Sequence, residues 1–322
     1  MAGHQQDIGF LSDVLVLTVR KSFWASKECE IFPNRIYTKI FYGYSQNRIN
    51  SLFLALKGLV YIFFHRPKII LVGSAIRIVP WLVKLKKRGG FAKTKLIATD
   101  YANDSDTIYL DRIILYSRDW IEHRSTEVRK KCVFMPLPAD GRFGLCKSTQ
   151  QRNYIFAGGG QDRDFKSLIE AVSGLDVHLK IVTISPEKLG QVGQLPANCE
   201  VLWKMPLQEF LELMAGSLFV VVPLIEANYP HGQTTLVQAL SLGKAVVVTR
   251  NVGIDEYMTD GKMGIIVSPG DVVGYREAIL RLLKNPDLRQ SYELNARAKA
   301  AELTYAAFSK RLVALCRELL AS

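Results

Sequence analysis

Short apolar runs that alternate with helical patterns constrain the fold of this chain more than any other feature of its sequence. In the first part of the chain, these runs are Asp13–Val19, Lys68–Gly73, Lys95–Asp100, Arg112–Ser117 and Cys132–Leu137. Each is almost continuously apolar, as strands that are covered on both faces require. Strands of this kind, separated by helices, predict a parallel sheet with helices on both of its sides.

A second series of the same kind follows a polar stretch at residues 140–153. Its strand-like runs are Tyr154–Ala157, Leu179–Thr183, Glu200–Trp203, Leu218–Pro223, Ala245–Thr249 and Gly264–Val267. A chain of 322 residues is long enough for two domains. We therefore expect an α/β protein with two doubly wound Rossmann-like domains facing a cleft, residues 1–140 and residues 141–322. Whether the last helix packs back on the first domain stays open.

Positive charge is concentrated in the N-terminal third. Residues 1–99 contain 16 lysines and arginines against 4 acidic residues, whereas residues 141–322 contain 20 against 18. Such a field favours an anionic partner, namely phospholipid head groups, a pyrophosphate-linked acceptor or nucleic acid. Nucleic acid ranks last, and is not expected as a partner, because the basic third has no aromatic-plus-basic recognition motif.

The most apolar stretch, Leu52–Phe64, contains Lys57 and is shorter than the roughly 20 residues that cross a bilayer. It predicts either a buried helix or an interfacial helix, which Arg77, Trp81 and the run Lys84–Arg88 would extend into a basic, apolar patch. The N-terminus shows no secretory signal, and the five cysteines lack metal-ligand or redox spacing. We expect a cytoplasmic protein with reduced thiols, with peripheral contact at the inner face of the membrane as the sharper alternative.

The first candidate site is the glycine turn after the strand Tyr154–Ala157. Gly158, Gly159 and Gly160 let the backbone approach a ligand closely. The helix that follows offers free N–H groups to a phosphate, and Arg163 adds a charge. A plain strand-to-helix turn is the competing interpretation.

The second candidate site is the start of the helix at residues 234–242. Gly232 precedes it, and Gln233, Thr234 and Thr235 supply polar side chains beside unpaired N–H groups. Gln238 lies one turn further along and is expected to face a ligand held at the helix start. An ordinary capped αβ unit is the alternative, since threonine caps helices anyway.

These segments together resemble a known family. Tyr229–Thr249, Gly253–Tyr257 and Asp260–Asp271 are similar to the donor-binding half of the GT-B superfamily, which includes glycogen synthase and many bacterial sugar transferases. Phe156–Val172 resembles the first strand, glycine turn and helix of that half. The resemblance spans residues 154–286 and implies a GT-B glycosyltransferase of hexosyltransferase type. Arg163 falls about where the family places a phosphate-binding lysine.

The chain departs from the family pattern at two glutamates. The family's second glutamate, which holds the ribose hydroxyls, is replaced by Gln238. The first, eight residues earlier, falls on Pro230, so His231 beside it is the candidate for a sugar-hydroxyl or phosphate contact. An amide still hydrogen-bonds a diol, but without charge.

The N-terminal domain resembles the family only in layout. Asp100 ends the strand that begins at Lys95, and it is the candidate general base for deprotonating an acceptor hydroxyl. A cap for the following turn is an equally good interpretation of Asp100. Asp104 and Asp106 have the spacing of a metal pair but lie in a polar loop, so neither a metal nor another cofactor is expected.

We therefore expect transfer of a sugar from a nucleoside diphosphate sugar to a saccharide or lipid-linked acceptor in glycan biosynthesis. A nucleotide-sugar epimerase or hydrolase is an alternative within enzymes. A non-catalytic nucleotide-sugar-binding subunit of a transferase complex is an alternative of another class, and the missing glutamates favour it. The sequence leaves the donor sugar, the acceptor and the stereochemical outcome undetermined.

Overall fold

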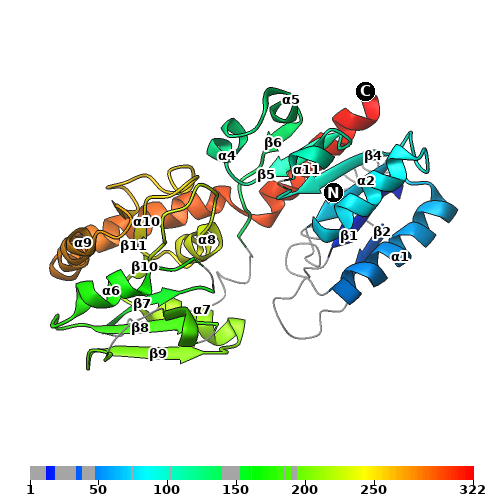
Figure 1. The fold of residues 1–322 in the computed structure, drawn as a ribbon. Helices are drawn as coiled ribbons and strands as arrows, with labels where there is room; N and C mark the ends of the chain where they lie inside the picture. Colours follow the sequence, from blue (N-terminus) through cyan, green and yellow to red (C-terminus); the bar gives the residue numbers. More distant parts are fainter. Residues whose placement is uncertain are drawn as a thin grey trace. The chain divides into compact units, whose positions relative to one another are not determined.

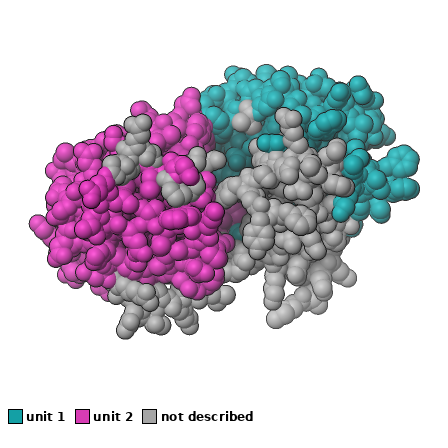
Figure 2. Space-filling view, turned by 60° about the horizontal axis from the view of Figure 1, so that its bottom comes forward, with its two compact units in different colours: residues 1–136, 305–322 teal, residues 137–304 magenta. Residues whose placement is uncertain are grey.

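The computed structural model describes residues 12–18, 34–37, 48–73, 76–101, 103–139, 153–160, 162–184, 186–189 and 194–322. The chain divides into two compact units, which Figure 2 distinguishes by colour. Unit 1 comprises residues 1–136 and 305–322, and unit 2 comprises residues 137–304. Most of the polar stretch expected to join two domains lies outside the described residues.

Unit 1 contains a six-stranded sheet in the order β2-β1-β3-β4-β5-β6 (Figure 1). The strands are β1 (Val14–Thr18), β2 (Asn34–Tyr37), β3 (Ile69–Gly73), β4 (Lys95–Thr99), β5 (Arg112–Leu115) and β6 (Cys132–Phe134). All neighbouring strands are parallel, as the continuous apolar runs predict. The predicted first strand included Val19, which is not among the described residues, and β2 had no counterpart in the sequence pattern.

Helices cover both faces of this sheet. The helices of unit 1 are α1 (Arg48–His65), α2 (Val79–Lys87), α3 (Asp104–Thr107), α4 (Arg118–Glu122), α5 (Thr126–Arg129) and α11 (Tyr305–Ala321), with a 3-10 turn, η5 (Ile76–Ile78). Leu15 and Leu17 pack under α1 and α2, whereas Val14 and Val16 pack under α11. This alternation is the period of two that a strand covered on both faces shows. The last helix of the chain therefore completes the core of unit 1.

Unit 2 contains a second six-stranded parallel sheet, in the order β12-β11-β10-β7-β8-β9. The strands are β7 (Tyr154–Gly158), β8 (His178–Thr183), β9 (Cys199–Trp203), β10 (Val220–Val222), β11 (Val246–Thr249) and β12 (Gly264–Val267). The first strand in sequence, β7, lies in the middle, between β10 and β8. The order therefore reverses between β7 and β10, where a doubly wound sheet binds ligands.

The helices of unit 2 also lie on both faces of the sheet. They are α6 (Phe165–Val172), α7 (Leu207–Gly216), α8 (Gln233–Ser241), α9 (Val272–Lys284) and α10 (Pro286–Glu302), with a 3-10 turn, η7 (Pro186–Leu189). The buried side chains of α6 and α9 form one core with one face of the sheet, and those of α7 and α8 form another with the opposite face. α10 contributes Tyr292 to the first core and Ala296 to the second. Two parallel α/β domains with helices on both faces confirm the predicted fold class.

The apolar segment Leu52–Phe64 lies within α1. Ile62 is 5% exposed and packs in the core, but Phe63 is 76% exposed and Phe64 is 73% exposed. The interpretation of this segment as a wholly buried helix is therefore wrong. The short stretch presents apolar side chains to both the core and the solvent, because successive residues of a helix point in different directions. No helix among the described residues is both long and apolar enough to cross a membrane.

Candidate functional site

The candidate site lies at the C-terminal ends of β7 and β10, where the strand order reverses. The loops that follow these strands are tied together by backbone hydrogen bonds. The N–H of Asp164 donates to the carbonyl of Pro223 at 3.2 Å, and the N–H of Ile225 donates to that of Asp162 at 3.3 Å. Arg163 and Leu224 form an antiparallel bridge between them. The two predicted segments, about 70 residues apart in sequence, thus form a single site.

The glycine turn after β7 has no room for side chains. A Cβ atom on Gly158 would lie 2.6 Å from the ring of Phe210, and one on Gly159 would lie 2.5 Å from the guanidinium of Arg163. Gly159 also has a φ of +135°, a conformation that is rare for residues other than glycine. The turn therefore brings bare backbone to the strand end, as a phosphate-binding turn requires.

Arg163 links the glycine turn to the start of α8. Its Nε donates to the carbonyl of Gly158 at 3.2 Å, and its Nη2 donates to Oγ1 of Thr235 at 3.0 Å. A guanidinium carries five N–H donors, and these two contacts hold that of Arg163 in place between the two segments. The sequence suggested both Arg163 and Thr235 as site residues, but the contact between them is visible only in the structure.

The start of α8 is shaped by Gly232, its N-cap. Gly232 has a φ of +86° and no side chain that caps the first turn. A Cβ atom there would lie 2.7 Å from the side chain of Leu224. The first-turn N–H groups of a helix with such a cap are suited to an anion, which the helix dipole also attracts.

The polar side chains of α8 take different positions. Thr234 is exposed, whereas Gln233, Thr235 and Gln238 are 6%, 4% and 8% exposed. Nε2 of Gln233 donates to the carbonyl of Val252 at 3.0 Å and so ties α8 to the loop after β11. Thr235 and Gln238 are three residues apart and lie on the same side of the helix.

His231 is oriented by Asn251. Oδ1 of Asn251 accepts from the N–H of Val252 at 2.7 Å, which fixes the amide so that Nδ2 faces the carbonyl of Ile225 and Nε2 of His231. If Nε2 of His231 accepts a hydrogen bond from this amide, the proton of the neutral ring is on Nδ1. Nδ1 is buried and has no hydrogen-bond partner among the described residues. With this tautomer, Nδ1 carries an N–H that no described residue satisfies.

The charge state of His231 follows from its surroundings. Burial lowers the pKa of His231, and the positive charge of Arg163 lowers it further, against smaller opposing effects of Asp162 and of the backbone of Ile225. The ring is therefore neutral near pH 7, since even an unperturbed histidine is mostly neutral there. A neutral ring donates to a hydroxyl or phosphate oxygen without adding charge. The sequence suggested His231 but carried no signal for the role of Asn251.

Asp100 is the one predicted site residue in unit 1. It follows β4 with a φ of +54°, and its N–H donates to the carbonyl of Ile114 at 2.9 Å. A positive φ in a residue other than glycine is strained, and such residues gather at functional sites. The N-cap of α3 is Asn103, whose side chain accepts from the N–H of Ser105. The side chain of Asp100 is exposed at the C-terminal end of the sheet.

The aspartate pair in α3 is engaged in contacts within the protein. Asp106 accepts a hydrogen bond from the hydroxyl of Tyr101 at 2.7 Å, and Asp104 pairs with Arg124 at 3.1 Å. Among the residues that the structure describes, no group of three or more potential metal ligands lies together.

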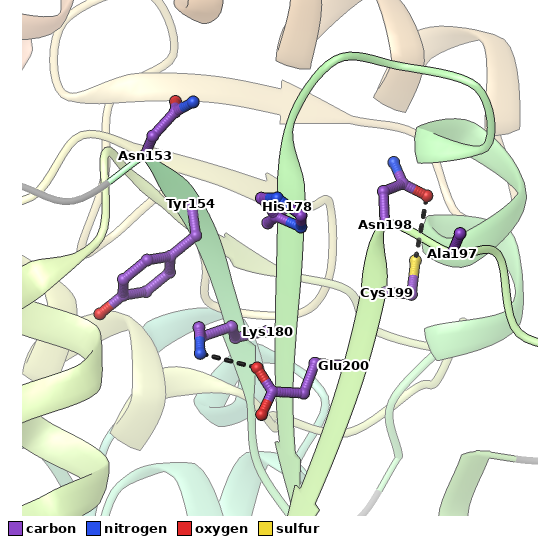
Figure 3. A pocket seen from close by; sticks show the side chains of 8 residues that line it. All are labelled: Asn153, Tyr154, His178, Lys180, Ala197, Asn198, Cys199 and Glu200. Carbon is purple, nitrogen blue, oxygen red and sulfur yellow. Dashed lines mark hydrogen bonds and ion pairs between the residues drawn. The ribbon is translucent and has the colours of Figure 1, made fainter.

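A cavity of about 510 Å³ lies elsewhere in unit 2 (Figure 3). Residues at the N-terminal ends of three strands line it, among them Tyr154, His178 and Cys199, the first residues of β7, β8 and β9. Lys180 pairs with Glu200 at 2.6 Å beside it. Because ligands of doubly wound sheets bind at the opposite, C-terminal ends, this cavity is not part of the candidate site.

Comparisons with known proteins agree with this architecture. The solved structures that resemble the chain include a glycosyltransferase from Rickettsia africae, with a TM-score of 0.69 at 14% identity over 95% of this chain and 98% of that one. Sucrose-phosphate synthase from Thermosynechococcus elongatus has a TM-score of 0.66 at 15% identity, over 90% and 84% of the two chains. HepE from Anabaena in complex with UDP has a TM-score of 0.62 at 13% identity, over 95% and 99%. The class defined by the two sheets is the GT-B fold.

Sequence comparison finds a family that is similar to most of the second unit. Residues 152–285 match the family described as Glycosyl transferases group 1. A curated relative, an uncharacterized glycosyltransferase of Methanocaldococcus jannaschii, is 33% identical over 75 residues, which are 23% of this chain and 19% of the relative. The match thus spans about a fifth of that relative's length. The resemblance expected from the glycine turn and the α8 segment is confirmed, because residues 152–285 are similar to this glycosyltransferase family.

Proposed function

We propose that the chain transfers a sugar from a nucleoside diphosphate sugar to a saccharide or lipid-linked acceptor. The observation that carries the proposal is the junction of the glycine turn, Arg163 and Thr235 at the reversal of strand order. This junction lies inside the segment that matches the glycosyltransferase family. The structure of HepE, which shares the fold, contains UDP.

The proposed donor site assigns one task to each group of residues. The backbone of the glycine turn and the first turn of α8 receive the diphosphate, and Arg163 supplies the positive charge. With these charges beside the phosphates, binding requires no metal ion. Gln238 hydrogen-bonds the ribose hydroxyls, and Nδ1 of His231 donates to a sugar hydroxyl or phosphate oxygen.

For the acceptor, we assign the general base to Asp100. Deprotonation of the attacking hydroxyl contributes about 10²- to 10⁴-fold to the rate in general base catalysis. The exposed carboxylate at a strand end and its strained backbone support this role. For a lipid-linked acceptor, we propose that the reaction takes place in glycan biosynthesis, in the cytoplasm and at the inner face of an anionic membrane.

A second candidate is a nucleotide-sugar-binding subunit without catalytic activity. It is favoured by Pro230 and Gln238, which stand where the family has its two glutamates. Such a subunit would bind the donor, as an enzyme does, but would not convert it. A nucleotide-sugar epimerase differs from both, because it would convert the donor without an acceptor.

A panel of nucleoside diphosphate sugars separates these functions. Calorimetry measures the binding of each donor to the full chain, and a coupled assay measures release of the nucleoside diphosphate with and without saccharide acceptors. We expect binding together with acceptor-stimulated release. Binding without release supports the subunit, isomerised sugar supports the epimerase, and absence of binding to the whole panel refutes the donor site.

A further inference from the structure

The exposed side of α1 carries a stripe of large apolar side chains. Leu56, Val60, Phe63 and Phe64 are 50%, 58%, 76% and 73% exposed. Their spacing of four, seven and eight residues puts them on one side of the helix. The rings of Phe63 and Phe64 pack edge to face against each other, with centroids 5.3 Å apart. The opposite side of α1 is anchored in the core by Ile62.

A second helix extends this surface. α2 shares its core with α1 and covers the same face of the sheet of unit 1, and η5, which precedes α2, packs against α1 (Figure 1). The outer side of α2 exposes Trp81, at 63%, next in sequence to the exposed Pro80. The two neighbouring helices thus present phenylalanine and tryptophan side chains from one layer of the unit.

The charge of this layer has a single sign. Residues 48–99 contain 11 lysines and arginines and no acidic residue. Lys57, Lys84 and Arg88 are exposed on or directly after the two helices. The other cations of the basic run are engaged, since Lys86 pairs with Asp111 at 2.6 Å and Lys87 lies over the ring of Tyr109.

We propose that the outer surface of α1 and α2 docks on a lipid bilayer with anionic head groups. Exposed aromatic and aliphatic side chains enter the boundary between head groups and acyl chains, while lysines and arginines contact the anionic head groups. Neither helix crosses the bilayer. This surface deepens the membrane contact of the proposed function, but lipid binding itself requires no transfer activity.

Charge complementarity decides between a bilayer and a second copy of the chain. Two copies joined through this surface would bring the cations of both layers together, without acidic residues from the same segment to pair with them. Like charges at an interface oppose association. An anionic membrane instead receives both the apolar stripe and the cations.

The test measures co-sedimentation of the full chain with phosphatidylcholine vesicles that contain or lack phosphatidylglycerol. We expect binding only to the anionic vesicles, and loss of that binding as salt screens the charges. The double variant Phe63→Ser with Phe64→Ser should bind at least about 10-fold more weakly, since insertion of the rings is lost. Replacing Lys57, Lys84 and Arg88 by Gln should each weaken binding by up to about 5-fold.

Matched controls come from unit 2, where Val273 and Leu294 are 66% and 60% exposed. The variants Val273→Ser with Leu294→Ser, and Lys262→Gln with Lys284→Gln, should bind vesicles like the wild type. A further readout is quenching of tryptophan fluorescence by brominated phospholipid, which should fall in Trp81→Phe. Melting curves show whether each variant is folded.

Three outcomes would overturn the proposal: no binding to anionic vesicles at low salt, equal binding to neutral vesicles, or unchanged binding of the phenylalanine variant. A dimer of the wild type in light scattering that becomes a monomer in that variant, without lipid binding, would identify a second copy as the occupant. UDP binding by calorimetry tests the donor site separately, because neither helix contributes to it. A failure of lipid binding is therefore distinguishable from a failure of the proposed transferase function.

Discussion

Both units contain a six-stranded parallel sheet covered on two faces. They differ in where the residues that suggest ligand binding are located. In unit 2, the specific features are concentrated at the C-terminal strand ends, in the glycine turn, Arg163 and the start of α8. In unit 1, they are spread over the surface of α1 and α2 as positive charge and exposed aromatic rings. The family match covers residues 152–285 and so falls in unit 2 alone.

The difference suits the two kinds of ligand that we propose for the two units. A diphosphate is small and requires backbone N–H groups at fixed positions, so glycines and a helix start suffice. An extended acceptor or a membrane requires a broad surface whose charge matters more than its geometry. The substitutions below test whether each unit has the role that we propose for it.

The largest effect is expected in unit 1, from Asp100→Asn. Asparagine tolerates the left-handed backbone at this position, so the fold should be preserved. Loss of the carboxylate should reduce kcat for transfer by about 10²- to 10⁴-fold, as loss of a general base does. UDP affinity should be unchanged. The control is Asp119→Asn, at an exposed position on α4. A normal kcat in the Asp100→Asn variant would show that Asp100 is not the general base.

Next in size is Arg163→Ala in unit 2. Loss of a charge-assisted contact should weaken binding of UDP or GDP by about 1–3 kcal/mol, equivalent to about 5- to 150-fold in Kd. Arg163→Lys should retain part of the affinity, because lysine keeps the charge without the planar fork. Calorimetry provides the measurement, with Arg281→Ala on α9 as the control. An unaltered Kd for UDP or GDP would show that Arg163 does not bind the phosphates. It would then contradict the phosphate site that we propose for unit 2.

Gln238→Ala should have a smaller effect, confined to the binding of the donor. A neutral hydrogen bond to ribose is worth about 0.5–1.5 kcal/mol, so the donor KM should rise by about 2- to 12-fold. Gln238→Glu, which restores the residue of the family, should lower the donor KM below that of the wild type. If Gln238→Ala lowers only the melting temperature, Gln238 has a structural role.

The smallest expected effect is a pH dependence of stability from His231. Folding lowers the pKa of His231, so the unfolded chain binds more protons once the pH falls below about 6.5. The contribution of His231 to stability is therefore fully present above that pH and is lost as the pH falls through the folded pKa. The melting temperature of His231→Gln should fall less than that of the wild type between neutral and mildly acidic pH. Parallel curves for the two proteins would contradict the assignment.

Much of the fold was predictable from local patterns. The continuous apolar runs indicated nearly all of the strands and their parallel arrangement, because a strand buried on both faces has little room for polar residues. Gly158, Gly159 and Gly232 indicated the two turns of the proposed donor site, because glycine relieves the backbone and steric constraints there. β2 was missed, since its sequence Asn34–Tyr37 is half polar and lies at the sheet edge.

The sequence by itself determined two parallel α/β units, the charge asymmetry and the segments of the proposed donor site. Only the tertiary structure decided that α11 completes the core of unit 1, that Arg163 meets Thr235, and that Asn251 orients His231. It also decided that Phe63 and Phe64 face solvent. Periodicity and turn residues specify local geometry, whereas contacts between distant segments depend on how whole elements pack. A helix that is apolar on several sides does not reveal in its sequence which side the core will cover.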